Sequence, residues 1–291
     1  MQVVYHLGAH CTDEDRILRC LLRNKGRLAE AGIVVPGPGR YRPLLRETLV
    51  ALRGGPASAE MQEILLDAVM EEDRAGRLVF CNDYFLGIAP RVVGDAGFYA
   101  SAPRRVAALA NLFPQAATEA TLGLRNPATL IPALLARMKD ASYDELMAGT
   151  DPESLSWLQV IRAVRAANPE VGLTVWCNED LPLIWPEVLR AVAGTGPEAE
   201  LAGDWDLVAS LVSAEGMAEL DARIGAAPPA TPAERRRITG EALERHGIEA
   251  EIEVEIDLPG WTAELVDRIT AAYEADCAAI RALPGLRFIA P

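Results

Sequence analysis

Short apolar runs alternate with longer stretches of helical periodicity along the whole chain. The runs span residues 2–7, 78–83, 118–124 and 172–177. Between them, apolar residues recur every three or four positions, which is the spacing of a helix that buries one face. Strands that alternate with helices predict a parallel sheet covered on both faces. We therefore expect a three-layer α/β/α fold with a central, mostly parallel sheet, formed as one domain over residues 1–291.

The first apolar run leads into a loop and then into an amphipathic segment. Gly8 and Ala9 form a small, flexible bend, and Thr12 is of a residue type that caps helices. Apolar residues then recur at helical spacing, at Ile17, Leu18, Leu21, Leu22 and Leu28. The pattern predicts a helix that begins after Thr12 and points its amino terminus at the loop, on the sheet edge where open α/β folds bind ligands.

Three consecutive acids, Asp13, Glu14 and Asp15, follow Thr12 and fall in the first turn of this predicted helix. A helix amino terminus carries about half a positive charge and unpaired N–H groups, so it stabilises a bound anion such as phosphate. We call the position at this helix terminus, beside the loop of residues 8–15, the anion seat. Carboxylates in the anion seat would repel a phosphate group. The segment thus has the outline of a phosphate-binding loop whose seat is already filled.

Five segments in order along the chain resemble P-loop sulfotransferases. YHLGAHCTDEDRILRCLL, residues 5–22, is similar to the nucleotide loop of that family. LVFCNDYFLG at 78–87 resembles its second core strand, and ATLGLRNPATLIPALL at 120–135 resembles its strand, Arg-x-Pro and helix. GLTVWCNEDLP at 172–182 resembles a late strand that ends in Tyr-Glu-Asp-Leu, and 259–291 resembles the closing helix and loop. The resemblance implies a P-loop-like architecture and the sulfuryl donor PAPS as the family's cofactor.

The nucleotide loop departs from the family pattern at most of its contact positions. When the two histidines and the glycine of the loop are aligned with the family, its lysine falls on Cys11 and its threonine on Thr12. The family's glycine falls on Asp13, and its last two hydroxyl residues fall on Glu14 and Asp15. Of these aligned positions, Thr12 is the one that keeps the family's residue.

A second part of the family's nucleotide site is partly kept. Arg125 and Pro127 match the Arg-x-Pro pattern, in which the arginine binds the 3′-phosphate of PAPS, whereas Ala133 stands where a serine binds the same phosphate. A guanidinium able to bind an anion with two hydrogen bonds therefore remains, without its hydroxyl partner. The cofactor-binding positions that the resemblance implies are Gly8, Ala9, Cys11, Thr12 and Arg125.

Two functions follow from this comparison. The first is a sulfotransferase-fold protein that has lost PAPS binding, holds no cofactor, and acts as a noncatalytic or repurposed binding protein. The second is an active PAPS-dependent sulfotransferase that transfers a sulfuryl group to a hydroxyl or amine. In the second case His10 or Asp83 is the catalytic base, because imidazole and carboxylate groups can accept a proton. Asp83 has a further interpretation as the ion-pair partner of Arg125.

Charge and composition limit the partners. A net charge of −14 disfavours binding to nucleic acid or to an acidic membrane surface. No apolar run approaches the roughly 18–20 residues that cross a bilayer, and the amino terminus has no secretory pattern, which predicts a cytoplasmic protein.

The five cysteines form no CxxC pair, so reduced thiols are expected. No metal site is expected, because His10, Cys11 and Asp13 are too close in one loop to converge on an ion.

Residues 32–42 contain two Pro-Gly pairs, which break a helix. They bring Arg40, Tyr41 and Arg42 to the edge of the predicted sheet. We expect these three side chains to line the mouth of a substrate site. The ligand itself, a small molecule or a protein, is not identified by the sequence.

Residues 249–261 alternate acids with Ile252, Val254 and Ile256. A period of two predicts an exposed edge strand or an extended arm with one apolar face. With the helical pattern that follows, it forms a carboxyl-terminal arm and helix at about 249–291. Such an arm is suited to pack against a basic partner surface, and it also leaves a homodimer open.

Overall fold

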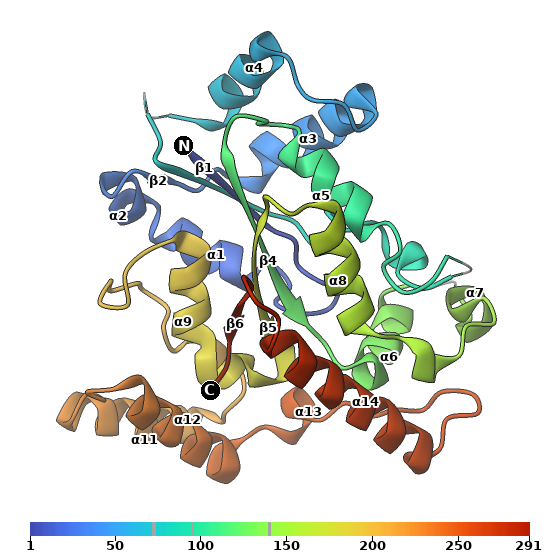
Figure 1. Ribbon diagram of the computed structural model, residues 1–291. Helices are drawn as coiled ribbons and strands as arrows, with labels where there is room; N and C mark the ends of the chain where they lie inside the picture. Colours follow the sequence, from blue (N-terminus) through green and yellow to red (C-terminus); the bar gives the residue numbers. More distant parts are fainter. Residues whose placement is uncertain (72–73, 95, 139–140) are drawn as a thin grey trace.

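Six parallel strands form the centre of the protein in a computed structural model that describes residues 1–71, 74–94, 96–138 and 141–291 (Figure 1). The strand order is β2-β3-β1-β4-β5-β6, and all five neighbouring pairs are parallel. The strands are β1 (Gln2–His6), β2 (Ile33–Val34), β3 (Arg77–Cys81), β4 (Ala117–Leu124), β5 (Gly172–Cys177) and β6 (Arg287–Ile289). The predicted α/β fold with a central parallel sheet is confirmed.

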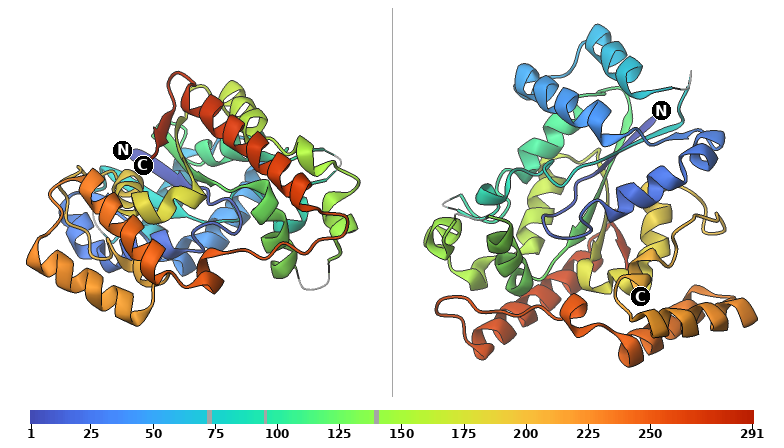
Figure 2. Two further views of the ribbon diagram at one scale, coloured as in Figure 1. Left: turned by 90° about the horizontal axis from the view of Figure 1, so that it is seen from below. Right: turned by 180° about the vertical axis from the view of Figure 1, so that it is seen from behind.

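Helices connect the strands and cover both faces of the sheet (Figures 1 and 2). Up to β4 they are α1 (Arg16–Arg23), α2 (Lys25–Glu30), α3 (Pro38–Leu52), α4 (Ala59–Val69), η1 (Ala89–Arg91) and α5 (Ala102–Ala110). Between β4 and the end of α9 they are α6 (Pro127–Arg137), α7 (Tyr143–Met147), η2 (Pro152–Ser154), α8 (Trp157–Ala167), η3 (Asn178–Asp180) and α9 (Leu181–Ala193). The remainder are α10 (Asp206–Ala209), α11 (Ala214–Ala226), α12 (Pro232–His246), α13 (Glu249–Ile252) and α14 (Ala263–Arg281).

The alternation of side chains along the strands divides the core into two layers. Val3 and Tyr5 of β1 point into an apolar cluster with α3, α4, α5, α6, α8 and α14, whereas Val4 points into a second cluster with α1 and α9. Successive residues of a strand face opposite sides of the sheet, so one short strand contributes to both clusters. Complete burial of a Val, Leu or Ile side chain contributes about 1.5–3 kcal/mol to stability. The two clusters give the three-layer arrangement.

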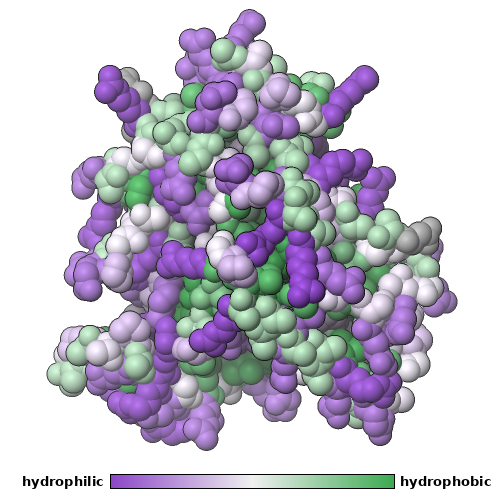
Figure 3. Space-filling view, viewed as in Figure 1, coloured by the Kyte–Doolittle hydropathy of each residue, from purple (hydrophilic) through white to green (hydrophobic). Residues whose placement is uncertain are grey.

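A third, smaller apolar cluster lies apart from the sheet, among α10, α11 and α12. Its buried members are Val208, Val212, Leu220, Ile238 and Ala242. In Figure 1 α11 and α12 lie below α9, and in Figure 3 hydrophilic side chains cover much of the surface over these two helices. This part of the chain is therefore a helical addition that is attached to one side of the sheet through α9 and through α1, whose Arg23 pairs with Asp206 of α10.

The structure corrects three of the predicted elements. The predicted helix after Thr12 begins only at Arg16 and is divided at Asn24 into α1 and α2. Residues 32–42 interrupt the helical structure only over a short stretch, because β2 is followed closely by α3. Of the two alternatives for residues 249–261, the edge strand is wrong, because they begin with the helical turn α13 and continue without regular structure. No helix in the part of the chain that the structure describes is long and apolar enough to cross a membrane.

Candidate functional site

The loop of residues 7–15 lies at the carboxyl edge of the sheet, between the ends of β3 and β4. The Leu7 amide donates to the Thr121 carbonyl of β4 (2.9 Å), and the Asn82 amide after β3 donates to the His6 carbonyl (3.1 Å). Gly8 has φ +48°, and a Cβ added there would lie 3.2 Å from the Cα of Asp83. Glycine is therefore favoured at this bend by both its conformation and its surroundings. The topology brings Gly8 and Asp83 together.

The loop contains an unusual number of left-handed residues. Cys11, Glu14 and Asp15 have φ values of 58°, 50° and 63°. A non-glycine residue in this region costs about 1 kcal/mol or more, so other contacts must offset the strain. Among them, Arg125 donates to the Cys11 carbonyl, and the Thr12 hydroxyl donates to the Ala9 carbonyl (2.6 Å). The side chain of Thr12 thus stabilises the loop and does not cap α1 as predicted.

Asp13 turns inward and occupies the anion seat. Its Oδ2 accepts the Ile17 amide in the first turn of α1 (3.2 Å), and its Oδ1 lies 2.9 Å from His6 Nε2. The other ring nitrogen of His6 contacts the Thr121 hydroxyl (2.9 Å), and only 7% of the Asp13 side chain is exposed. Burial raises the pKa of Asp13, but the charge and hydrogen bond of His6 and the Ile17 amide outweigh it, so the pKa lies below its ordinary value.

The three acids do not share the first turn of α1, as the sequence predicted. Because α1 begins at Arg16, all three precede it and point in different directions. Asp13 faces His6, Glu14 is exposed, and Asp15 binds Arg42 of α3 with two hydrogen bonds of 3.0 and 2.5 Å. One acid therefore fills the anion seat, and another ties the loop to α3.

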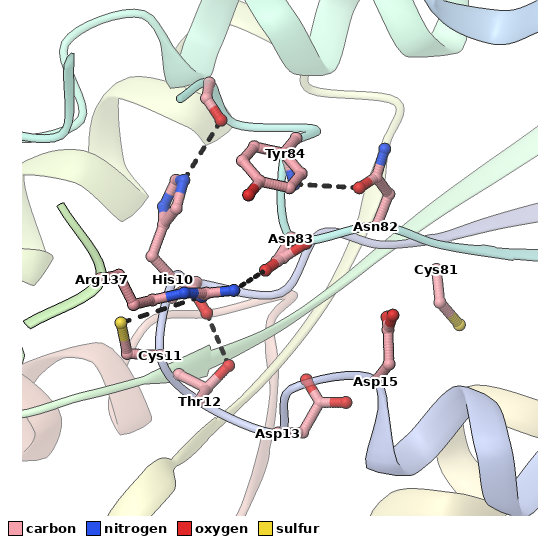
Figure 4. A network of polar contacts seen from close by, with 12 residues as sticks. His10, Cys11, Thr12, Asp13, Asp15, Cys81, Asn82, Asp83, Tyr84 and Arg137 are labelled. Atoms are coloured by element: carbon pink, nitrogen blue, oxygen red, sulfur yellow. Dashed lines mark hydrogen bonds and ion pairs between the residues drawn. The ribbon is translucent and has the colours of Figure 1, made fainter. Parts of the chain in front are cut away.

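Arg125, the predicted phosphate contact, is bound to protein groups. Besides the Cys11 carbonyl, its Nε donates to the Thr129 hydroxyl (3.1 Å). The predicted ion pair between Arg125 and Asp83 is wrong, because Asp83 pairs with Arg137 at the end of α6 (3.2 Å). Figure 4 shows the Arg137 guanidinium between the Asp83 carboxylate and the sulfur of Cys11, 3.9 Å from Nη1.

Arg137 was missed by the sequence analysis. It is the last residue of α6, the helix that begins just after Arg125 at Pro127. The helical pattern of 127–137 could have placed it near the sheet edge, but nothing in the pattern shows that α6 runs back over the loop. With Arg125 and Arg42, it brings three cations to the loop, each of which already has a protein partner.

His10 is buried and has a partner at each ring nitrogen. Nδ1 lies 3.0 Å from the Tyr99 hydroxyl, and Nε2 lies 3.2 Å from the Gly87 carbonyl. A carbonyl only accepts, so Nε2 carries the proton and Nδ1 accepts from Tyr99. Burial lowers the pKa of His10, although Asp83 opposes the shift. The neutral ring therefore has no free nitrogen with which to accept a proton from a substrate.

The thiol and metal chemistry of the loop is equally constrained. Cys11 is buried, and burial raises the pKa of its thiol, which disfavours the reactive thiolate. His10 contacts Tyr99, whereas Asp13 contacts His6. Among the residues described by the structure, no group of three or more His, Cys, Asp or Glu side chains could hold a metal ion.

A cavity of about 890 Å³ lies beside this loop, between α3, α5 and the segment that follows β3. Arg42 lines it and links it to Asp15. The two neighbouring residues that were expected at a substrate mouth lie elsewhere: Arg40 pairs with Glu71 (2.7 Å), and Tyr41 is buried with its hydroxyl donating to the Cys81 carbonyl (2.6 Å). None of residues 8–15 lines the cavity.

Comparison of this chain with protein-family models, with curated proteins and with solved structures finds no match. The structure shows an α/β protein with a six-stranded parallel sheet. The likeness to P-loop sulfotransferases remains a prediction from sequence.

Proposed function

We propose that this chain has a sulfotransferase-like scaffold that no longer holds PAPS and acts as a noncatalytic or repurposed binding protein. The observation that carries the proposal is the position of Asp13. Its carboxylate accepts the Ile17 amide at the start of α1, where a phosphate oxygen would otherwise accept, and it is held there by His6. Asp13 thus satisfies the helix terminus from within the chain.

Electrostatics argue against a phosphate beside Asp13. Two like charges about 4 Å apart repel by about 4 kcal/mol at an effective dielectric constant of about 20. The cations that might compensate are already used, because Arg125 binds Cys11 and Arg137 binds Asp83. A nucleotide would have to displace Asp13 from His6 and also recruit an arginine from its present partner.

The competing function is an active PAPS-dependent sulfotransferase. It is favoured by Arg125, which follows β4 and reaches the loop at Cys11, as the family's phosphate contact would. In that case His10 or Asp83 accepts the proton of the acceptor hydroxyl or amine. His10 would first have to leave Tyr99, and Asp83 would have to leave Arg137.

Isothermal titration with PAP or PAPS distinguishes the two. We expect no binding up to high micromolar nucleotide, because the anion seat is filled. A micromolar dissociation constant, or transfer of labelled sulfate from PAPS to any of a panel of hydroxyl and amine acceptors, would refute the proposal.

Two variants test whether the Asp13 carboxylate in the anion seat is the reason that PAP does not bind. Cys11→Lys restores the family's lysine but leaves Asp13 in place, so it should not restore PAP binding. Asp13→Asn keeps an oxygen that can accept from the Ile17 amide but removes the charge, and it should bind sulfate more tightly than the wild-type protein does. Equal sulfate binding by wild type and Asp13→Asn would mean that the carboxylate does not exclude anions.

A further inference from the structure

The cavity beside the loop has the size of a site for a small organic molecule. It has a volume of about 890 Å³ and is lined by two helices, α3 and α5, and by the segment that follows β3. Ligand sites for small molecules usually enclose about 300–1,000 Å³ and combine apolar walls with a few polar groups. The residues lining it are Arg42, Pro43, Leu45, Arg46, Leu49, Val50, Arg53, Gly54, Asn82, Tyr84, Phe85, Gly87, Ile88, Arg104, Arg105, Ala108 and Leu109.

The charge of the cavity is opposite to that of the protein. Five arginines line it and no Asp or Glu does, although the chain has 42 acids and a net charge of −14. In the part of the chain that the structure describes, Arg42 is neutralised by Asp15, whereas Arg46, Arg53, Arg104 and Arg105 have no hydrogen-bond or ion-pair partner. A concave surface of this kind attracts an anion.

Arg105 is the most constrained of these cations. Its Nε is buried without a hydrogen-bond partner, and its guanidinium packs against Gly87, where an added Cβ would lie 3.5 Å from Nε. Burial lowers the pKa of Arg105, and the nearby charges of Arg104 and Arg91 lower it further. A buried guanidinium N–H without an acceptor is unfavourable, and an anionic ligand is one way to supply the acceptor.

Apolar side chains are also exposed at this cavity. Of the eight large hydrophobic residues that are exposed in the described chain, three line it: Val50 (73% exposed), Tyr84 (51%) and Ile88 (48%). Leu45, Leu49, Phe85 and Leu109 extend the apolar wall inward. A ligand that covered these residues would bury apolar surface and would gain free energy that the free protein lacks.

We propose that the cavity binds a small anionic amphiphile, an organic acid whose head group contacts Arg104 and Arg105 and whose apolar body lies along α3. The inference rests on the proposed function and deepens it, since it names the ligand class of the repurposed binding protein. A single carboxylate, sulfate or phosphate head provides the acceptors that the arginines lack, and guanidinium groups bind such heads with two hydrogen bonds. The net charge of −14 disfavours nucleic acid as the occupant.

Decanoate, used below its micelle concentration, is the test ligand, with 1-decanol and decyltrimethylammonium as matched neutral and cationic probes. Isothermal titration should give a micromolar dissociation constant for decanoate and at least about tenfold weaker binding of the other two. Decanol binding as tight as that of decanoate would overturn the proposal, because the arginines would then not distinguish an anionic head group from a neutral one. No binding of decanoate would overturn it as well.

Three variants locate the site. Arg104→Gln with Arg105→Gln should weaken decanoate binding by about tenfold or more, and Ala108→Trp should weaken it by filling the space against α5. Arg162→Gln is the control, since Arg162 is an exposed helical arginine outside the cavity. Circular dichroism verifies that each variant is folded. Unchanged decanoate affinity in the folded double variant and in Ala108→Trp would overturn the assignment.

Addition of PAP to the decanoate complex separates this inference from the proposed function. Binding of decanoate together with absence of PAP binding supports both. If PAP binds and decanoate stays bound, the proposed function fails while the amphiphile site stands. If PAP displaces decanoate, both fail. Sedimentation with phosphatidylglycerol vesicles, without any binding of free decanoate, would instead make this face a membrane-binding surface and would refute the small-molecule site.

Discussion

His10 shows how a single buried side chain couples the site to pH. Its neutral ring accepts from Tyr99 and donates to the Gly87 carbonyl, and burial lowers its pKa from an ordinary value of about 6.5. As the pH falls below about 6.5, the unfolded chain takes up a proton on this residue before the folded chain does, so protonation favours unfolding. The stabilisation is present above this pH and is lost below it.

We therefore expect His10→Gln to reduce the pH dependence of stability between pH values of about 7 and about 5. The wild-type free energy of unfolding should fall as the pH is lowered over this range. His10 should contribute up to about 1.4 kcal/mol per pH unit to this slope. Urea unfolding of both proteins at the two pH values measures it. Parallel slopes would show that His10 is protonated to the same extent in the folded and unfolded chains.

The residues of the site were predicted only in part. Gly8 could be placed from its position after an apolar run, and the topology does bring it to Asp83. The partners of Asp13 could not be found, because three residues in the left-handed region redirect the loop in a way that spacing does not reveal. Tyr99, the partner of His10, lies far along the chain with no motif around it.

At the scale of elements, long-range pairing decided which predictions held. The four strands with five or more residues were found from sequence, whereas β2 and β6 were missed because they have only two and three residues. The period of two at 249–256 did not give a strand, since alternation permits strand formation but a neighbouring strand must be available to pair with it. The edges of the sheet are taken by β2 and β6.

Glu179 illustrates how elements are joined. It follows β5 in η3, accepts the Asn126 amide before α6 (2.8 Å), and accepts the Tyr273 hydroxyl of α14 (2.7 Å). Glu179 thus braces the end of β5 against α6 and α14. Its role could be inferred from a strand ending in acids, but not its two partners.

Two cysteines join the same elements. Cys177 at the end of β5 and Cys277 in α14 are free thiols with sulfur atoms 3.1 Å apart, although 99 residues separate them in the sequence. The hydrogen bond with Cys277 lowers the pKa of the Cys177 thiol, which favours its oxidation. The absence of a CxxC pair did not reveal this contact.

We expect diamide to convert this pair to a disulfide, with the two thiol hydrogens passing to the reagent. Titration of free thiols should then fall by two per chain, and the cross-link should stabilise the fold by about 2–4 kcal/mol. Cys277→Ser is the control and should lose no thiol pair. Retention of all five thiols in the wild type after diamide treatment would contradict the prediction.

At the scale of the whole molecule, we expect the helices α11 and α12 to form a unit of lower stability. Their buried apolar residues lie in the small third cluster, whereas Leu207 of α10 belongs to the cluster with α1 and α9. Helix α12 is attached to α9 through Arg235 and Arg236, both of which bind Glu187. Regions with few buried apolar contacts open locally more often than the central sheet does. The apolar pattern of this segment predicted part of a single domain and did not indicate a separate core.

Glu187→Gln should loosen this unit without unfolding the sheet. Loss of the paired charge costs about 1–3 kcal/mol locally, so amide hydrogens of α11 and α12 should exchange faster while those of β1, β3 and β4 stay unchanged. Hydrogen exchange by mass spectrometry measures both. Glu153→Gln, which removes an exposed pair with Arg268, is the control and should change neither. Faster exchange throughout the sheet would contradict a separate unit.

The strand order has a consequence for synthesis on the ribosome. Strand β1 lies in the middle of the sheet and is translated before its two neighbours, which begin only at Arg77 and Ala117. A nascent chain therefore exposes the unpaired backbone and apolar side chains of β1 until the residues of β3 and β4 have been translated. Folds dominated by such distant pairings form slowly, and they depend most on protection from aggregation during translation.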